Sequence, residues 1–209
     1  MADSVVDVNE VLKTLAKKRI PFVLTGTHGI SGWTGRSRAT LDVDILVKSG
    51  RNYARAIKAI RELYPRLETR VFFGVTGFFK PGEKESLLDI TYPHRADIEE
   101  TLANPVWVDD KELGIRYRVP SLEAALANKY GAMLTVSRQS RKRRQDVLDF
   151  EWMVVHSLDE ARVPIDLEKL AMLGEKVWPG GGGAEIVRLV ATVKAGQPIE
   201  LSNLGIEQS

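Results

Sequence analysis

The stretch Leu41-Asp42-Val43-Asp44-Ile45-Leu46-Val47 decides the fold, because two acids alternate there with branched apolar residues. Side chains alternate along a strand, so the apolar positions Leu41, Val43, Ile45 and Val47 share one face, while Asp42 and Asp44 share the other. The run Leu87-Leu88-Asp89-Ile90-Thr91-Tyr92 repeats this pattern with a single acid, Asp89. We therefore predict two strands that pack an apolar face on helices and present acids on the opposite face.

These three acids predict a metal site. Their carboxylates would repel one another if they lay close together, unless divalent cations neutralised them. Carboxylate oxygens are the ligands that Mg²⁺ prefers. The alternative is that Asp42 and Asp44 face solvent on a half-exposed strand and that Asp89 forms a salt bridge at a strand end. The turn Thr25-Gly26-Thr27 favours the metal site, since a residue without Cβ lets backbone N–H groups approach a phosphate.

Composition limits the other kinds of site. The chain has 209 residues, 44% of them hydrophobic, which suits one or two domains with a true core. It has no cysteine, which excludes disulfides, thiol nucleophiles and thiolate metal sites, and its three histidines are poorly spaced for zinc. Acids near the start and the lack of an apolar run of ~18 residues argue against secretion and membrane insertion. We expect a cytoplasmic protein.

Basic residues are concentrated in one segment. The formal net charge of +2 does not by itself indicate nucleic acid. Between Lys129 and Arg144, however, there are six basic residues and no acid. This local excess favours a polyanion such as a triphosphate or RNA, and the alternative is a solvated helix start. Arg36 and Arg38, just before the first acids, are candidates for neutralising phosphate charge.

Periodicity and turn residues predict an α+β fold. Strands crowd into the first 120 residues and helices into the rest, which indicates an α/β core over 1–120 and a C-terminal helical subdomain over 121–209. Asp7 is expected to cap the first helix, and the Gly- and Ser-rich segment 26–38 reads as a loop with one helical turn at most. The remaining expected elements are strands at 22–24, 41–47, 70–75 and 86–92, a ribbon at 106–110 and 115–119, and helices at 52–63, 96–102, 121–156 (broken near 137–140) and 166–196 (interrupted by the glycine run at 180–183).

The order of these motifs resembles the DNA polymerase beta nucleotidyltransferase superfamily. That pattern is a strand, Gly-Ser, a variable segment, Asp-x-Asp on the next strand and a third Asp on a later strand. Here Thr27 stands where the superfamily usually has Ser, which keeps a hydroxyl. The resemblance implies a nucleotidyltransferase-type mixed β-sheet packed on helices, followed by a helical subdomain that completes the site.

A second group of residues is similar to the abortive-infection type IV toxin nucleotidyltransferases. It comprises Val119-Pro120-Ser121-Leu122-Glu123, then Lys129, then Arg143-Arg144-Gln145-Asp146-Val147-Leu148-Asp149. Gln145 stands where those proteins usually have Lys, with the basic Arg144 beside it. Together the two resemblances cover about residues 22–150.

The resemblance also implies roles for individual residues. Asp42 and Asp44 would bind two Mg²⁺ ions, with Mn²⁺ as an alternative, and Asp89 would complete the second ion's shell or take the acceptor's proton. The nucleotide would be bound by Gly26, Thr27, Arg38, Lys129, Arg143 and Arg144. Asp146 would support the site by orienting the basic groups, and the alternative for this residue is a salt bridge within its helix.

The leading hypothesis is a Mg²⁺-dependent enzyme that moves NMP from an NTP to an acceptor hydroxyl. The acceptor is left open between RNA or tRNA, a protein and a small molecule, with RNA slightly favoured by the basic segment. The resemblance also raises a toxin role with a cognate antitoxin. A non-catalytic nucleotide- or RNA-binding module, acting as an antitoxin or scaffold, is the alternative. A third possibility is an RNA-binding protein that uses only the basic helix.

Overall fold

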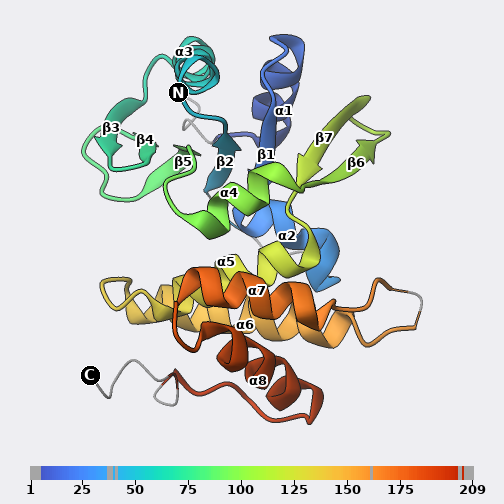
Figure 1. The fold of residues 1–209 in the computed structure, drawn as a ribbon. Helices are drawn as coiled ribbons and strands as arrows, with labels where there is room; N and C mark the ends of the chain where they lie inside the picture. Colours follow the sequence, from blue (N-terminus) through green and yellow to red (C-terminus); the bar gives the residue numbers. More distant parts are fainter. Residues whose placement is uncertain (1–5, 37–39, 41, 161, 202–203, 205–209) are drawn as a thin grey trace. The chain divides into compact units, whose positions relative to one another are not determined.

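The computed structural model describes residues 6–36, 40, 42–160, 162–201 and 204. The chain divides into two compact units, one formed by Met1–Ile30 with Arg38–Pro120 and the other by Ser31–Ser37 with Ser121–Ser209. The first unit contains a mixed β-sheet with helices, and the second is helical (Figure 1). The predicted α+β class is confirmed. Arg38, proposed above as a phosphate ligand, lies outside the described residues.

A five-stranded sheet forms the centre of the first unit. Its order is β1 (Phe22–Thr25), β2 (Val43–Val47), β5 (Ser86–Thr91), β4 (Val75–Phe79) and β3 (Glu68–Phe72). β2 and β5 run parallel, and every other neighbouring pair is antiparallel. The two strands that carry the predicted acids are therefore direct neighbours, although about forty residues separate them in the chain.

Two helices cover the apolar face of this sheet. They are α1 (Val8–Lys17) and α3 (Arg51–Leu63). The carboxylate of Asp7 accepts a hydrogen bond from the amide of Asn9 at 2.8 Å, so the predicted N-cap is confirmed. The core buries Val11, Leu12, Leu15, Val43, Ile45, Ala56, Ile60, Leu88 and Ile90. Each large aliphatic side chain buried in this way stabilises the fold by about 1.5–3 kcal/mol.

A short helix and a ribbon complete the first unit. The helix is α4 (Ala96–Ala103), and the ribbon pairs β6 (Val106–Asp110) with β7 (Ile115–Val119). The ribbon is tied to the sheet because Nε of Arg118 donates a hydrogen bond to the carbonyl of Phe22 at 3.0 Å. Both elements were predicted.

Two local predictions were wrong. Gly26–Thr34 forms a helix, α2, where the glycines and serines indicated a loop. Close packing requires glycine at position 29, because a Cβ there would overlap the carbonyl of Leu24. The strands expected at 70–75 and 86–92 were predicted to pair directly as a hairpin, but an additional strand, β4, lies between them, and the chain reverses at Gly74 with φ of 79°. Gly77, read as a turn residue, lies inside β4.

Four helices make up most of the second unit. They are α5 (Leu122–Leu134), α6 (Ser140–His156), α7 (Leu167–Val177) and α8 (Gly182–Lys194). Ser121 caps α5 by accepting a hydrogen bond from the amide of Ala124 at 3.3 Å. The break near 137–140 and the interruption at the glycine run were predicted. In the part of the chain that the structure describes, no helix is long and apolar enough to cross a membrane.

The glycine run forms a tight turn that joins α7 closely to α8. A Cβ at Gly182 would overlap the carbonyl of Gly174, so only small residues allow this approach of the two helices. The carboxylate of Glu175 accepts hydrogen bonds from the amides of Gly180, Gly181 and Gly183. A carboxylate is favourable there because the first amides of α8 have no partners within the helix.

Candidate active site

The predicted acids lie in one row of side chains across the sheet. Asp44 of β2 stands directly opposite Asp89 of β5, and both are half-buried. Neighbouring strands lie about 4.8 Å apart, so the two carboxylates begin from adjacent positions on the same face. The row continues through Thr25 on one side and Gly77 on the other. It lies on the face opposite the core, as the alternation of acids and apolar residues predicted.

Two glycines leave space for these carboxylates. Gly26 has φ of 59°, and a Cβ there would overlap Oδ2 of Asp44. A Cβ at Gly77 would lie 3.0 Å from Oδ1 of Asp89. Gly26 is therefore required by the carboxylate of Asp44, whereas a Cβ at Gly77 would first overlap the ring of Phe79, at 2.6 Å, with Asp89 as the next neighbour. Gly77 was missed as a site residue, although a glycine within Val75-Thr76-Gly77-Phe78-Phe79 is a signal of close approach.

Hydroxyl groups hold this part of the site. The hydroxyl of Thr25 donates to the carbonyl oxygen of Asp44 at 3.2 Å, which ties β1 to β2 beside the acids. Asp42 lies just before β2, and its carboxylate accepts a hydrogen bond from the hydroxyl of Thr40. Neither threonine was singled out from the sequence, because threonine is common beside strands and gives no distinct pattern.

The donor set suits Mg²⁺ in chemistry, since every candidate ligand is a carboxylate oxygen. The structure brings Asp44 and Asp89 together. Among the described residues, however, no group of three or more His, Asp or Glu side chains could hold a metal ion. Asp42 is thus placed next to the pair without joining it, and the metal-binding role of the three acids stays a prediction.

The start of α2 gives Gly26 and Thr27 their position. The helix begins at Gly26, directly after β1, so its first amides lie beside Asp44. The first amides of a helix have no helical carbonyl as partner and carry a partial positive charge, which suits an anionic phosphate. Sequence reasoning assigned this contact to a loop, and the helix offers the same N–H groups in a more fixed arrangement.

In the second unit, Lys129 joins two buried acids. Its ammonium lies 2.9 Å from Oδ1 of Asp146 and 2.7 Å from Oδ2 of Asp149. Asp146 also pairs with Arg138, whose Nε lies 2.7 Å from Oδ2. Nε2 of Gln145 donates to Asp149 at 3.2 Å. The predicted orienting contact of Asp146 is therefore made with Lys129 and Arg138 instead of with a neighbour in its own helix.

Asp149 and Arg138 belong to this cluster and were not among the predicted site residues. Asp149 follows Asp146 by three positions, a spacing that places both on one helix face and was available as a signal. Arg138 lies in the basic segment without a distinguishing pattern. Nε of Arg143 donates to the carbonyl of Met133 at 2.8 Å, near the end of α5. Arg144 is exposed.

Comparison with known families gives the class of this protein, which is a nucleotidyltransferase. A model of the nucleotidyl transferase AbiEii toxin family, from type IV toxin–antitoxin systems, matches residues 10–177. Because the match spans most of the chain, this protein belongs to the AbiEii family. The predicted resemblance is confirmed.

Solved structures with similar folds share little sequence with the chain. An antigenic nucleotidyltransferase-like protein from Paracoccidioides brasiliensis is 17% identical, covers 87% of this chain and 90% of its own, and has a TM-score of 0.49. The antibiotic-resistance factor ANT(2'')-Ia is 16% identical over 90% of this chain and 94% of its own, with a TM-score of 0.48. JHP933 from Helicobacter pylori is 14% identical over 93% and 92%, with a TM-score of 0.49. No curated protein sequence matches the chain.

Proposed function

We propose that this protein transfers NMP from an NTP to a hydroxyl group of an acceptor, in a reaction that depends on Mg²⁺. The observation that supports this most is the opposed pair Asp44 and Asp89, with glycines at 26 and 77 leaving room for both carboxylates. Gly26 in particular leaves no space for a Cβ beside the carboxylate of Asp44, so only glycine fits at this position. Family membership supports the same class of reaction.

In this proposal Asp42, Asp44 and Asp89 hold the metal, with Mn²⁺ as a substitute. Bound ions of this kind stabilise the negative charge of the triphosphate and make a hydroxyl more acidic. The amides of Gly26 and Thr27 bind the phosphates and orient them. The acceptor oxygen attacks the α-phosphorus, the bond from this phosphorus to the β-phosphate oxygen breaks, and pyrophosphate leaves. Asp89 accepts the proton of the hydroxyl.

Two basic surfaces support a polyanionic acceptor such as RNA or tRNA. In the second unit the first turn of α6 carries Arg141, Lys142 and Arg143 with no acid, and Gln139 provides no side-chain cap. Cations at a helix N-terminus are locally unfavourable, so their gathering there favours a charge-binding role. Of the charge-balancing groups predicted in the basic segment 129–144, Arg144 is exposed and takes this role in the proposal, whereas Lys129 is held between Asp146 and Asp149.

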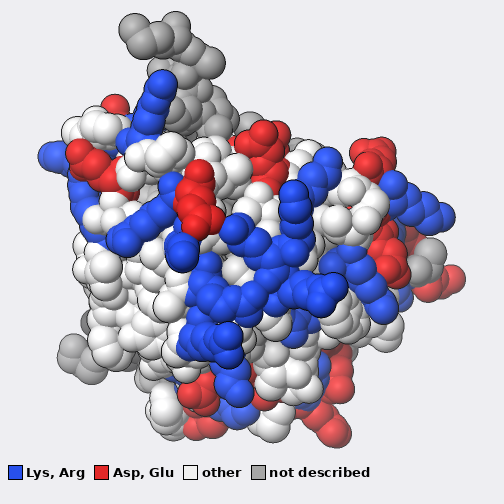
Figure 2. All heavy atoms as spheres, turned by 90° about the horizontal axis from the view of Figure 1, so that it is seen from above, with Lys and Arg blue, Asp and Glu red and all other residues white. Residues whose placement is uncertain are grey.

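The first unit has a second basic surface on the outer sides of α1 and α3. Figure 2 shows Lys and Arg gathered in a band on this face. Its exposed members on and just after the two helices are Lys13, Lys17, Lys18, Arg19, Arg51, Lys58 and Arg61, against the exposed acids Glu10 and Glu62. Phosphates of an RNA would be attracted to such a surface, with an affinity that falls steeply as salt rises. The family description supports the further proposal of a cognate antitoxin.

Transfer from labelled NTPs to total RNA tests the proposed function. We expect Asp44→Asn and Asp89→Asn each to lower the transfer rate by at least about 100-fold, since even residues that only support metal ligands are worth 10–100-fold. Asp109→Asn is the matched control, because Asp109 is an exposed strand acid paired with Arg116. EDTA should abolish transfer and added Mg²⁺ should restore it. Unchanged transfer in both site variants would reject the assignment of these acids.

A further inference from the structure

One edge of the sheet exposes three consecutive apolar side chains. β3 is the last strand, and in the described part of the sheet it pairs with β4 alone. Val71 is 73% exposed, Phe72 56% and Phe73 81%. Natural edge strands usually carry charges, proline or a bulge at such positions, because unpaired backbone groups attract another strand. This edge lacks those devices at its apolar end, which indicates a surface that is covered by a partner.

A row of buried side chains on the core face of the sheet ends at this edge. Leu24, Ile45, Ile90 and Thr76 stand opposite one another on successive strands and are all buried, and Val71 is the next member. Its exposure shows that α3 does not reach far enough to cover the end of the row. Beside it lies a cavity of about 580 Å³ between α3 and the strands.

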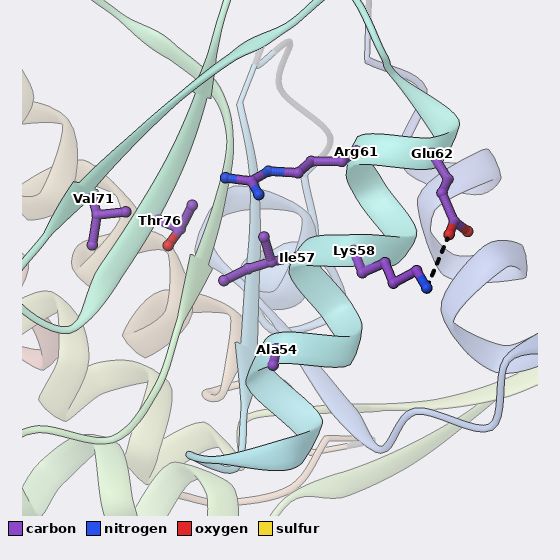
Figure 3. Close-up of a pocket in the computed structure, with 7 residues that line it drawn as sticks. All are labelled: Ala54, Ile57, Lys58, Arg61, Glu62, Val71 and Thr76. Atoms are coloured by element: carbon purple, nitrogen blue, oxygen red, sulfur yellow. Dashed lines mark ion pairs between the residues drawn. The ribbon is translucent and has the colours of Figure 1, made fainter.

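This cavity has an apolar base and a cationic rim. Ala54, Ile57 and Val71 line its apolar part, and Lys58 and Arg61 lie at its rim (Figure 3). Ile57 and Arg61 point from α3 toward the strand that carries Thr76. The carboxylate of Glu62 is paired with Lys18 at 2.8 Å and faces Lys58 at 4.0 Å. An uncharged aromatic ring therefore fits this cavity well, since it fills the apolar part and can stack beneath a guanidinium.

We propose that a second copy of this chain covers the edge, with the two β3 strands antiparallel about a two-fold axis through Val71. In an antiparallel pair of strands, two residues that stand directly opposite each other point to the same face of the sheet. A two-fold axis between two copies of β3 must therefore pass between one residue and the same residue of the other copy. An axis at Arg70 would oppose two guanidinium groups. An axis at Thr69 would leave Phe73 beyond the paired strands. An axis at Phe72 would oppose no like charges, but within β3 it would pair only Phe72 with its own copy, because the strand ends there. The axis at Val71 covers all three exposed side chains, opposes no like charges and pairs residues 70–72 of each strand.

This register makes complementary contacts. Val71 meets its own copy, and Arg70 lies opposite Phe72 of the partner subunit on the other face, twice by symmetry. Arg70 already stacks on a ring in this way, because its guanidinium carbon lies 4.3 Å from the centroid of Phe79. Phe73 of the partner subunit comes beside Thr69, whose hydroxyl accepts a hydrogen bond from Arg61 at 2.8 Å. That position is at the rim of the cavity, which the partner's Phe73 would enter.

The area involved predicts a weak dimer. A fully exposed aromatic side chain presents roughly 150–250 Å², so Phe72 and Phe73 leave roughly 200–340 Å² open in each copy. The rings of both copies are covered in the dimer, and each ring covers a similar area of the other copy. The total surface buried in the interface is therefore roughly 800–1,400 Å², at or below the low end of specific interfaces. We therefore expect association that depends on concentration in the micromolar range.

The absence of cysteine makes a cross-linking test clean. Val71→Cys introduces a single thiol at the proposed axis, and Val136→Cys is the matched control because Val136 is 72% exposed in another part of the chain. A short bis-maleimide should convert most of the Val71→Cys protein to a dimer at concentrations where Val136→Cys stays monomeric. Equal cross-linking of the two variants would overturn the proposal.

Sedimentation equilibrium provides a second measurement that needs no new thiol. The unmodified protein should show a monomer–dimer equilibrium between low and several hundred micromolar. Val71→Lys places two ammonium groups on the axis and should weaken association at least tenfold, whereas Val136→Lys should leave it unchanged. A monomer at every concentration, or equal association of both lysine variants, would overturn the proposal and leave the edge to a different protein. The test does not depend on nucleotidyl transfer.

Discussion

Replacing Lys129 by methionine is expected to destabilise the helical unit strongly. The side chain of Lys129 is only 12% exposed, and those of Asp146 and Asp149 are 3% and 1% exposed. Methionine keeps the length and apolar stem of lysine but removes the ammonium. Two buried carboxylates then lose a shared cation, and a buried charge without its partner is costly.

The magnitude follows from what each acid retains. Asp146 keeps Arg138 at 2.7 Å, whereas the amide of Gln145, at 3.2 Å, is a neutral donor to Asp149. Breaking a buried ion pair by removing one partner costs about 3–5 kcal/mol. In a chain of this size each kcal/mol lowers Tm by about 2–4 °C, so the expected fall is roughly 6–20 °C.

Tryptophan fluorescence during urea and thermal unfolding measures this loss. Trp33, Trp152 and Trp178 belong to the helical unit, and Trp107 alone belongs to the sheet unit. Asp149→Asn added to Lys129→Met should recover part of the stability, because it removes a buried charge that has lost the ammonium of Lys129. Lys194→Met, at an exposed helix end, should change stability by no more than about 0.5 kcal/mol. A Lys129→Met protein within about 1 kcal/mol of the unmodified one, the average effect of any point substitution, would refute the reasoning.

Two further substitutions test the glycine-dependent parts of the fold. Gly26→Ala should lower the stability more than Gly50→Ala does, and it should also lower the transfer activity. Both glycines have positive φ, 59° and 73°, but only at position 26 would a Cβ overlap Asp44. Equal urea midpoints and equal activities in the two variants would contradict this. Glu175→Gln should flatten the acid end of the pH–stability curve. Hydrogen bonds from the amides of Gly180, the larger effect, and of Gly183 hold the pKa of Glu175 below its ordinary value of 4.5. The stability that the ionised Glu175 adds is therefore present above pH 4.5 and is lost as pH falls through the lowered pKa. The same slope of Tm against pH below 4.5 in both proteins would count against the contact.

Elements whose signals are local could be predicted from the sequence. The N-cap at Asp7, the stop after α3 and the alternation in 41–47 each depend on residues within a few positions, and each appears in the structure. The helix α2 and the strand β4 could not be predicted in this way. Gly29 and Gly77 have low propensity for their elements, and both are required by close contacts that exist only in the folded chain, with the carbonyl of Leu24 and the ring of Phe79.

Several residues of the candidate site could also be predicted from the sequence, but the contacts between them could not. The strand acids were identified from alternation alone, but their meeting depends on the parallel pairing of β2 with β5, which no local pattern specifies. Lys129 was assigned a charge-balancing role from its basic surroundings. Its buried contacts with Asp146 and Asp149 depend instead on how α5 packs against α6. Sequence reasoning thus recognised which residues carry charge, and the fold determines which of these charges meet.

The register of β2 links the stability of the sheet to the arrangement of its acids. Adjacent rows of the sheet have opposite roles, since Ile45 opposes Ile90 in the core and Asp44 opposes Asp89 on the other face. A slip of one residue would turn Asp44 toward α1 and α3 and expose Ile45. Burying an unpaired carboxylate costs several kcal/mol, and exposing a buried isoleucine costs about 1.5–3 kcal/mol more. The apolar core therefore fixes the acid pair indirectly, and mutations in the core that allow register shifts should lose activity before they lose secondary structure.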